Sequence, residues 1–221
     1  MVPIGARVAD VGADHGYLGI HLLEMGVVSY VAACDLRPGP LDSARRNAAL
    51  YGCADRMGFF LSDGLQSVPR NLYDTVVCAG MGGDLIVKIL SEAPRLRNPG
   101  HTLILQPQID IDKLRLWLGE NGFTEDKADL AEDGGFVYCA LRARYTGEAY
   151  ALSPGQRFVS PALLASGSPL LGPYIARTRA TLGRIAEGLA KADAHPEPQR
   201  LETLQTAIRE LEEMEKYYVN R

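Results

Sequence analysis

The stretch RVADVGADHGYLGIHLL, Arg7–Leu23, decides the fold. Its apolar run Val8–Val11 is typical of a buried strand, and the glycine-containing turn and helical pattern after it are typical of α/β proteins that hold a nucleotide-like ligand. The turn also contains Asp14 and His15. A carboxylate among the backbone N–H groups that bind a pyrophosphate would repel it. The turn therefore predicts a ligand that tolerates acid beside it.

Short β-branched runs alternate with helical patterns up to about residue 145, which predicts a doubly wound α/β fold. The last two apolar runs are separated only by AEDGG, Ala131–Gly135, so they form a hairpin and one strand runs antiparallel. A seven-stranded sheet with one reversed strand is the Rossmann-like arrangement of class I methyltransferases. The expected strands are Arg7–Gly12, Tyr30–Asp35, Met57–Ser62, Thr75–Ala79, Thr102–Gln106, Thr124–Leu130 and Phe136–Arg144, and the expected helices are Tyr17–Met25, Pro40–Tyr51, Asp84–Ala93 and Asp112–Asn121.

The pattern changes after residue 147. Residues 148–170 are rich in Gly, Pro and Ser, which indicates a linker with one short helix. Apolar residues at three- and four-residue spacing then predict an antiparallel coiled-coil hairpin over 171–221, with its turn at HPEP, His195–Pro198. The expected apolar seam comprises Ile175, Thr178, Leu182, Ile185, Leu189 and Ala192 in the first helix and Leu201, Leu204, Ile208 and Leu211 in the second.

Composition narrows the class of protein. The 221 residues, 47% of them hydrophobic, suffice for one ordinary core and a smaller appendage. No apolar run approaches the roughly 20 residues of a membrane span, and no signal-peptide pattern is evident, so we expect a soluble cytoplasmic protein. Neither the cysteines nor the histidines show metal-ligand spacing, so we expect no metal, and we expect buried reduced thiols at Cys34, Cys53, Cys78 and Cys139.

Charge is distributed unevenly along the chain. Residues 1–150 carry 14 Lys and Arg against 19 Asp and Glu, whereas residues 151–221 carry 9 against 8. The hairpin is therefore the better candidate for contact with RNA phosphates. A solvated coiled-coil face, or a packing or dimerisation arm of an otherwise monomeric protein, is the alternative. The candidate phosphate contacts are Arg177, Arg179, Arg184, Arg200 and Arg209.

Acidic residues follow the ends of successive strands. S-adenosylmethionine fits an acidic cradle because it carries a sulfonium and an ammonium, and its ribose hydroxyls donate to a carboxylate. Asp10 ends the first strand, where it can face the ammonium, and Gly12 lets the backbone approach the ligand. Asp35 lies 23 residues after Gly12, where it can accept from the ribose diol, although NAD would use the same spacing. Asp63 follows the third strand and can accept from the adenine amino group.

The turn Gly80–Gly82 ends the fourth strand, at the edge where methyltransferases place the transferred methyl group. Taken singly, Asp10 and Asp63 could be helix or turn caps, and the glycines could be ordinary turns. Their recurrence at four successive strand ends favours a ligand site. The expected cofactor-binding residues are Asp10, Gly12, Gly16, Asp35, Leu36, Asp63, Gly64, Gly80, Met81 and Gly82.

Five longer segments are distinctive: VADVGADHGYL (Val8–Leu18), SDGL (Ser62–Leu65), AGMGGDLIVKIL (Ala79–Leu90), LILQPQ (Leu103–Gln108) and LRLWLGENGF (Leu114–Phe123). Together they resemble the bacterial tRNA (adenine(22)-N(1))-methyltransferase family, and the likeness continues into the hairpin. It implies a Rossmann-like catalytic domain over 1–147, a C-terminal coiled-coil domain, and S-adenosylmethionine-dependent methylation of adenine N1 in tRNA. The family usually has a basic helical segment before the first strand, so part of RNA binding and active-site closure is expected to depend on such a segment.

The fourth-strand turn also bears on which nitrogen is methylated. Methylation of an exocyclic adenine amine normally uses an Asn/Asp-Pro-Pro-aromatic turn, which this chain lacks. Ring N1 attacks through its in-plane lone pair, so the enzyme supplies mainly alignment and a carboxylate for the cationic product. Asp14 and His15 are the catalytic candidates near N1, and Tyr17 is a candidate wall for an extruded base. The structural alternatives are a helix cap for Asp14, a turn hydrogen bond for His15 and a core position for Tyr17.

Other functions would use parts of the same pattern. A class I methyltransferase acting on another RNA, a protein or a small molecule would share the cofactor site without needing the hairpin arginines. A non-catalytic RNA-binding scaffold would leave the strand-end acids without a purpose. An NAD-dependent oxidoreductase would have to bind a pyrophosphate at the first turn, where the Asp14 carboxylate would repel it.

Overall fold

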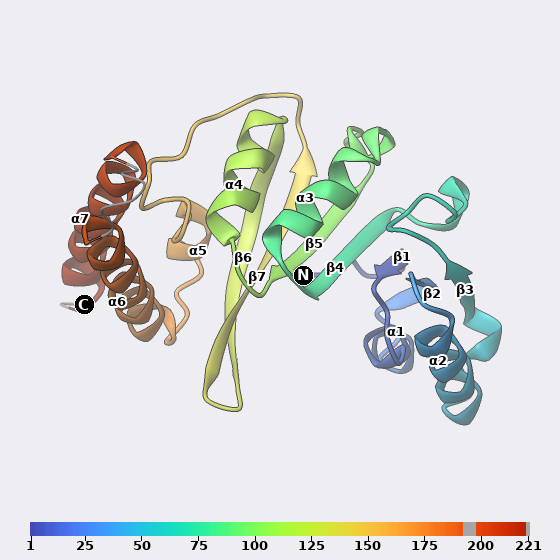
Figure 1. Cartoon of the computed structure of the whole chain (residues 1–221). Coiled ribbons are helices and arrows are strands. Elements are labelled where there is room, and N and C mark those ends of the chain that lie inside the picture. Colours follow the sequence, from blue (N-terminus) through green and yellow to red (C-terminus); the bar gives the residue numbers. More distant parts are fainter. Residues whose placement is uncertain (192–197, 220–221) are drawn as a thin grey trace.

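The computed structural model describes residues 1–191 and 198–219, and its seven-stranded sheet has the order β3-β2-β1-β4-β5-β7-β6 (Figure 1). β7 runs antiparallel to β5 and β6, and the other neighbouring strands are parallel, which confirms the predicted sheet. The strands are β1 Ala6–Val11, β2 Val28–Asp35, β3 Met57–Leu61, β4 Thr75–Met81, β5 Thr102–Pro107, β6 Phe123–Asp133 and β7 Phe136–Tyr145. The α-helices are α1 Tyr17–Glu24, α2 Pro38–Leu50, α3 Gly83–Ser91, α4 Ile111–Glu120, α5 Pro161–Leu164, α6 Leu171–Ala190 and α7 Pro198–Val219, with short 3-10 helices at Ala54–Arg56, Arg70–Leu72 and Pro94–Leu96.

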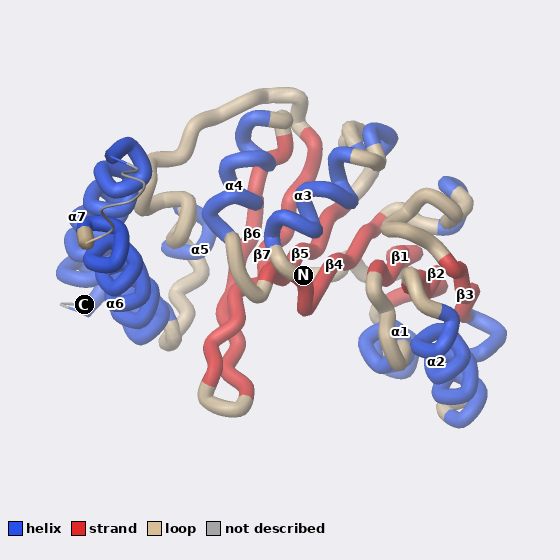
Figure 2. Tube along the Cα trace, in the orientation of Figure 1, coloured by secondary structure: helices blue, strands red, loops and turns tan. Residues whose placement is uncertain are grey.

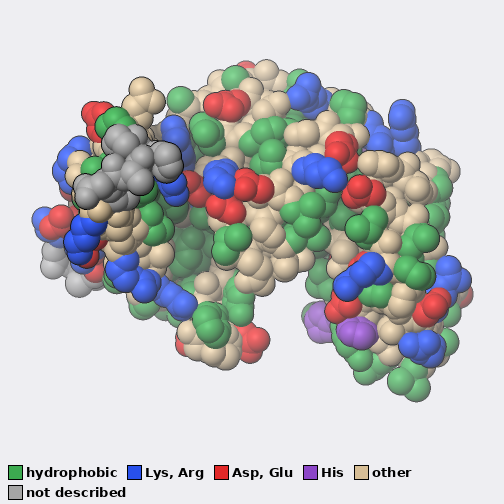
Figure 3. All heavy atoms as spheres, in the orientation of Figure 1, with side chains coloured by type: hydrophobic (Ala, Val, Ile, Leu, Met, Phe, Trp, Pro, Cys, Tyr) green, Lys and Arg blue, Asp and Glu red, His purple; other side chains and the backbone are tan. Residues whose placement is uncertain are grey.

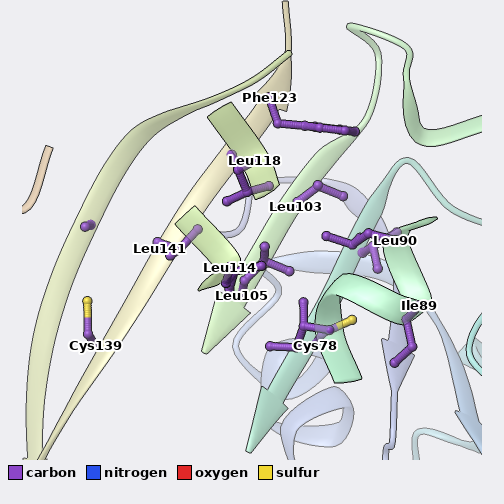
Figure 4. Close-up of a cluster of buried hydrophobic side chains, with 14 of the residues drawn as sticks. Cys78, Ile89, Leu90, Leu103, Leu105, Leu114, Leu118, Phe123, Cys139 and Leu141 are labelled. Carbon is purple, nitrogen blue, oxygen red and sulfur yellow. The ribbon is translucent and has the colours of Figure 1, made fainter. Parts of the chain in front are cut away.

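Helices cover both faces of the sheet, because successive strand residues point to opposite sides. In β1, Val8 belongs to the apolar cluster that includes α1, whereas Val11 belongs to the larger cluster that includes α3 and α4. Figure 4 shows Leu114 of α4 close to Leu105 of β5 in the larger cluster. Strands buried on both sides leave only their ends free for function. The order of strands reverses between β1 and β4, and ligands of open α/β sheets bind at the carboxyl side of this point.

The strands β6 and β7 form a ribbon that projects past the rest of the sheet. β7 pairs with β5 over Leu141–Arg144, whereas its pairing with β6 continues to Phe136, opposite Asp133. The predicted hairpin is confirmed, but its turn is tighter than expected, because strand pairing takes up part of Ala131–Gly135. The projecting end lies at the same edge as the carboxyl ends of β4 and β5 (Figure 1).

Helices α6 and α7 form the predicted hairpin, with one correction to its seam. Ile175 and Leu182 are buried as expected, but Ile185 is 39% exposed and Ala186 is buried in its place. A seven-residue repeat drifts relative to a helix of 3.6 residues per turn, so the neighbouring position turns toward the core. The predicted seam residue Ala192 and the turn residues 195–197 lie outside the described residues.

The segment 148–170, expected as a linker, crosses from the end of β7 to the C-terminal helices (Figure 2) and packs closely on the way. Val159 and Leu163 are fully buried, and they belong to the same apolar cluster as Leu171 and Leu211 of the hairpin. The hairpin therefore shares one continuous core with the sheet. The domain boundaries expected at 147 and 171 stay a prediction.

A buried ion pair anchors this segment to the sheet. Arg115 of α4 and Glu125 of β6 are 1% and 4% exposed, and they form two hydrogen bonds of 2.8 and 3.1 Å. Arg115 also donates to the backbone carbonyl of Phe158 at 2.6 Å, and Ser160 donates to the Glu125 carboxylate. Buried charges need such complete pairing, since either ion alone would lack the solvation it has in water.

Two expectations drawn from composition can be compared with the described residues. The four cysteines are buried free thiols, as predicted, and burial together with the Asp10 carboxylate raises the pKa of Cys78 to about 12. In the part of the chain that the structure describes, no helix combines the length and apolar character needed to span a membrane.

We expect Glu125→Ala to lower the free energy of unfolding by about 3–5 kcal/mol, because it leaves the Arg115 guanidinium buried without its counter-ion. The matched control is Asp126→Ala, whose carboxylate is a third exposed and pairs with Arg142, and whose loss should cost less than about 1 kcal/mol. Urea titration monitored by circular dichroism measures both. Equal losses in the two variants would contradict the anchoring role.

Candidate functional site

Asp10 is the most unusual side chain at the carboxyl edge of the sheet. It is 4% exposed at the end of β1, and its Oδ2 atom has no hydrogen-bond partner among the described residues. Desolvation by this burial raises the pKa of the carboxyl group from 3.8 to about 7. A buried polar oxygen without a partner costs free energy unless a ligand satisfies it. A hydrogen-bond donor, most favourably a cationic one, would satisfy this oxygen.

Gly12, two residues after Asp10, has a backbone conformation that favours glycine. Its φ of 71° is in the left-handed region, and a Cβ atom there would lie 2.8 Å from the Cε atom of Met81. Glycine suits this backbone conformation, and the Met81 side chain lies beside it at the ends of β1 and β4. The first and fourth strand ends form one continuous cradle.

The fourth strand ends two residues later than predicted, at Met81 rather than Ala79. Gly80 adopts a φ of 76° and lies at a shift in the pairing of β4 with β5, as in a β-bulge. Its N–H leaves the strand ladder and donates to the Oε1 atom of Gln106 at 2.8 Å. Sequence reasoning missed Gln106, whose position near the end of β5 was the available signal.

Asp35 is a buried carboxylate that fixes the two loops beside it. It is 8% exposed, and its Oδ1 and Oδ2 atoms accept from the backbone N–H groups of Arg37 at 2.9 Å and Asp14 at 3.4 Å. Each carboxylate oxygen has a second lone pair, so Asp35 can still accept from a diol. Leu36 follows it with 67% exposure and can form an apolar wall.

Asp63 lies after β3 and is less enclosed. Its side chain is 44% exposed, and its Oδ2 atom lies 3.5 Å from the Nζ atom of Lys88. Lys88 belongs to α3, directly after the fourth-strand turn, and sequence reasoning did not identify it. Gly64 adopts a φ of 55°, and a Cβ atom there would lie 3.2 Å from Ile89, so Asp63 precedes a tight turn.

The three catalytic candidates lie together in the first loop, with their side chains toward solvent. Asp14 has a φ of 47°, which is uncommon for any residue other than glycine. Its Oδ2 atom is 3.6 Å from the Nε2 atom of His15, and the His15 and Tyr17 rings are 6.0 Å apart. Gly16, not Asp14, is the N-cap of α1, and no side chain caps that helix. Tyr17 is 57% exposed, so it is not a core residue.

Figure 3 shows a hollow at this edge, between the projecting β6–β7 ribbon and the helices α1 and α2. The catalytic candidates precede or begin α1, and the Gly80–Gly82 turn ends β4. The hollow therefore opens beside the residues that the sequence singled out. Within the described residues, no group of three or more His, Cys, Asp or Glu side chains is arranged to hold a metal ion.

The candidate phosphate contacts on the hairpin divide into two sets. Arg179 pairs with Glu215 at 3.0 Å, and Arg184 and Arg209 each donate to a threonine of their own helix. Arg177 and Arg200 line a groove between the hairpin and the sheet. The guanidinium of Arg177 lies over the Phe136 ring, 5.2 Å from its centroid.

The raised pKa of Asp10 predicts a pH-dependent stability. Because the folded state holds this proton more tightly than the unfolded state, the contribution of Asp10 is fully present below about pH 4 and is lost as pH rises toward about 7. The wild-type protein should therefore lose about 2 kcal/mol of unfolding free energy between pH 5 and pH 7.5 relative to Asp10→Asn, which does not titrate. Urea titrations of both proteins at the two pH values measure this difference. A difference that does not change with pH would contradict the burial of an unpartnered carboxyl group.

Comparison with known proteins identifies the family. Residues 1–141 match the family described as methyltransferase domain. The chain is 30% identical over 178 residues to the tRNA (adenine(22)-N(1))-methyltransferase of Bacillus subtilis strain 168, and the match covers 80% of this chain and 71% of that protein.

Solved structures agree with this match. The crystal structure of the B. subtilis m1A22 tRNA methyltransferase matches with a TM-score of 0.83 and 27% identity, over 97% of this chain and 94% of that one. A Streptococcus pneumoniae protein, solved in complex with S-adenosyl-L-methionine, matches with a TM-score of 0.79 and 29% identity, over 96% of this chain and 94% of that one. The chain therefore belongs to the tRNA (adenine(22)-N(1))-methyltransferase family.

Proposed function

We propose that this protein methylates N1 of adenine 22 in tRNA, with S-adenosylmethionine as the methyl donor. The observation that carries the proposal is the buried, unpartnered Asp10 carboxylate beside the Gly12 and Gly80–Gly82 turns. Family membership supports the substrate, since the B. subtilis relative carries this activity in its name.

The residues at this edge fit S-adenosylmethionine. The Oδ2 atom of Asp10 lacks a partner in the described chain and would accept from the methionine ammonium. The left-handed Gly12 keeps the cradle free of a side chain, and Met81 lies directly opposite. When bound, S-adenosylmethionine supplies a methyl group on a sulfonium. The negative charge of Asp10 suits this cationic ligand, whereas it would repel a pyrophosphate.

The remaining cofactor contacts follow from the next two strand ends. Asp35 would accept from the ribose hydroxyls, because its two oxygens are already oriented by the N–H groups of Arg37 and Asp14. The exposed Leu36 would pack against the adenine face, and Asp63 would accept from the adenine amino group. Gly16 and Gly64 would keep the adjoining turns close to the ligand.

At the acceptor end, the chain has to orient a base rather than remove a proton. Ring N1 of adenine carries a free lone pair, so no general base is needed. The Gly80–Gly82 turn offers no side-chain amide to grip an exocyclic amine, and Gln106 holds this turn through the Gly80 N–H. Asp14 would stabilise the positive charge that develops on the ring, His15 would assist it, and Tyr17 would contact the base.

We assign catalysis to residues 1–147 and tRNA contact to the hairpin at 171–221. The hairpin shares its core with the sheet through Leu171 and Leu211, so it can hold tRNA at a fixed distance from the site. We further propose that the protein acts as a monomer in the cytoplasm.

The direct test uses two unmodified tRNA transcripts, one natural and one with guanine in place of adenine 22. Labelled S-adenosylmethionine should transfer its methyl group to the first transcript and not to the second. Equal labelling of both transcripts would place the methyl group elsewhere in tRNA, and labelling of neither would refute the proposed activity.

We expect Asp35→Ala and Asp63→Ala each to weaken S-adenosylmethionine binding by about 1.5–3 kcal/mol, because each removes charge-assisted hydrogen bonds to the ligand. Asp42→Ala, an exposed position on α2, is the control with the same change of charge and should leave the affinity unchanged. Isothermal titration calorimetry measures all three. Unchanged affinity in both site variants would refute the cofactor contacts assigned to them.

We expect Asp14→Asn to lower kcat at least tenfold while changing the affinity for S-adenosylmethionine by less than about twofold, because its charge acts mainly on the transition state. The Asn side chain preserves the shape of the left-handed turn, so the loop should keep its conformation. Steady-state kinetics with tRNA and calorimetry with the cofactor separate the two effects. Equal losses of binding and turnover would move Asp14 from catalysis to the cofactor cradle.

A further inference from the structure

A large groove lies between the sheet and the C-terminal hairpin, apart from the strand-end cradle. Its volume is about 900 Å³, and its walls come from the loop between β5 and α4, the β6–β7 ribbon, α6 and the start of α7. Residues that line it include Ile109, Lys113, Phe136, Arg177, Ile185 and Arg200. The cofactor contacts proposed above leave this groove without a role.

The groove adjoins the fourth-strand turn of the proposed active site. Its wall residue Ile109 would lie 3.6 Å from a Cβ atom at Gly82, in the fourth-strand turn. The backbone also joins the two regions, since Gln108 donates to the carbonyl of Met81 at 2.9 Å and Gly83 donates to that of Ile109 at 2.9 Å. The loop that forms one wall of the groove therefore packs directly on the fourth-strand turn.

The groove combines exposed apolar surface with positive charge. Ile109, Phe136 and Ile185 are 65%, 56% and 39% exposed, although large apolar side chains are usually buried. Three arginines line the groove, Arg157, Arg177 and Arg200. Lys113, Asp110 and Asp112 also line it, and Lys113 pairs with Asp110 and with Asp84. This excess of positive charge occurs in a chain whose formal net charge is −4.

We propose that this groove binds the unpaired tRNA nucleotides that adjoin the target adenine. Single-stranded nucleic acid binds in positively charged grooves, where aromatic and apolar side chains contact the base faces. Phe136 and Ile109 provide such faces, and Arg177 and Arg200 lie where phosphates would follow. The guanidinium of Arg177 lies over the Phe136 ring, so it also fixes the ribbon end against α6. The proposal rests on the proposed function and adds a substrate contact outside the cofactor cradle.

A second copy of the chain is the less favourable occupant. Two-fold pairing of this face would bring the same basic side chains of both copies together, and like charges at an interface oppose association. A polyanion meets no such repulsion. The charge of the groove thus favours RNA over self-association.

The test compares two pairs of arginine substitutions, one in the groove and one on a distant surface. The groove variant is Arg177→Gln with Arg200→Gln. The matched control is Arg70→Gln with Arg97→Gln, two exposed positions that precede β4 and β5 at the opposite edge of the sheet and do not line the groove. Each variant removes two positive charges. Filter binding with unmodified tRNA at several salt concentrations should show about tenfold weaker binding for the groove variant, and a logarithmic salt slope smaller by about 1.5, as expected for two lost phosphate contacts. The control should bind within about twofold of the wild type, and both variants should keep the wild-type calorimetric affinity for S-adenosylmethionine.

Photo-crosslinking gives an independent readout. Wild-type protein with tRNA that carries 4-thiouridine beside the target adenine should yield crosslinked peptides from the ribbon end around Phe136 or from α6. Equal binding losses in the two variants, or crosslinks confined to other elements, would overturn the proposal. So would a concentration-dependent dimer in analytical ultracentrifugation that Ile185→Asp dissociates without weakening tRNA binding. Failure of the proposed function would look different, because wild-type protein would then transfer no methyl group to tRNA at all.

Discussion

The site depends on one buried carboxyl group, that of Asp10, which the fold holds without a partner for its Oδ2 atom. Burial between the ends of β1 and β4 costs free energy, and the raised pKa of the group is the measure of that cost. A cationic ligand relieves it, whereas an anionic one increases it. Two residues further on, Gly12 adopts a left-handed φ of 71° and lies against the Met81 side chain. We propose that the electrostatics of this strand end favour a cationic cofactor.

The second half of the chain shares its apolar core with the sheet. The Arg115–Glu125 pair fixes the segment around Phe158 and Ser160 to the sheet, and this segment leads into the hairpin. The β6–β7 ribbon projects to the same edge as the cradle and contacts α6 through Arg177. A rigid link of this kind lets binding energy from distant parts of a large substrate position the reacting base.

Much of the fold follows from patterns that are local in sequence. Strand and helix positions were predictable to within a few residues, because apolar periodicity reports which residues face the core, and Ala131–Gly135 identified the reversed strand. What could not be predicted depends on contacts between residues far apart in the chain. The Gln106–Gly80 hydrogen bond, the Lys88–Asp63 pair and the burial of Arg115 have no signal in spacing alone. The seam position Ile185 was wrong because a seven-residue repeat drifts relative to a helix of 3.6 residues per turn, which turns Ala186 toward the core in its place.

The central claim is that the Gly80–Gly82 turn presents a ring nitrogen, and not an exocyclic amine, to the methyl group. The most direct measurement is nucleoside analysis of unmodified tRNA after incubation with the protein and S-adenosylmethionine, by liquid chromatography and mass spectrometry against retention standards. Digestion must avoid alkali, because N1-methyladenosine rearranges under alkaline conditions. The account predicts N1-methyladenosine as the product, and direct formation of N6-methyladenosine or of a methylated guanosine would contradict it.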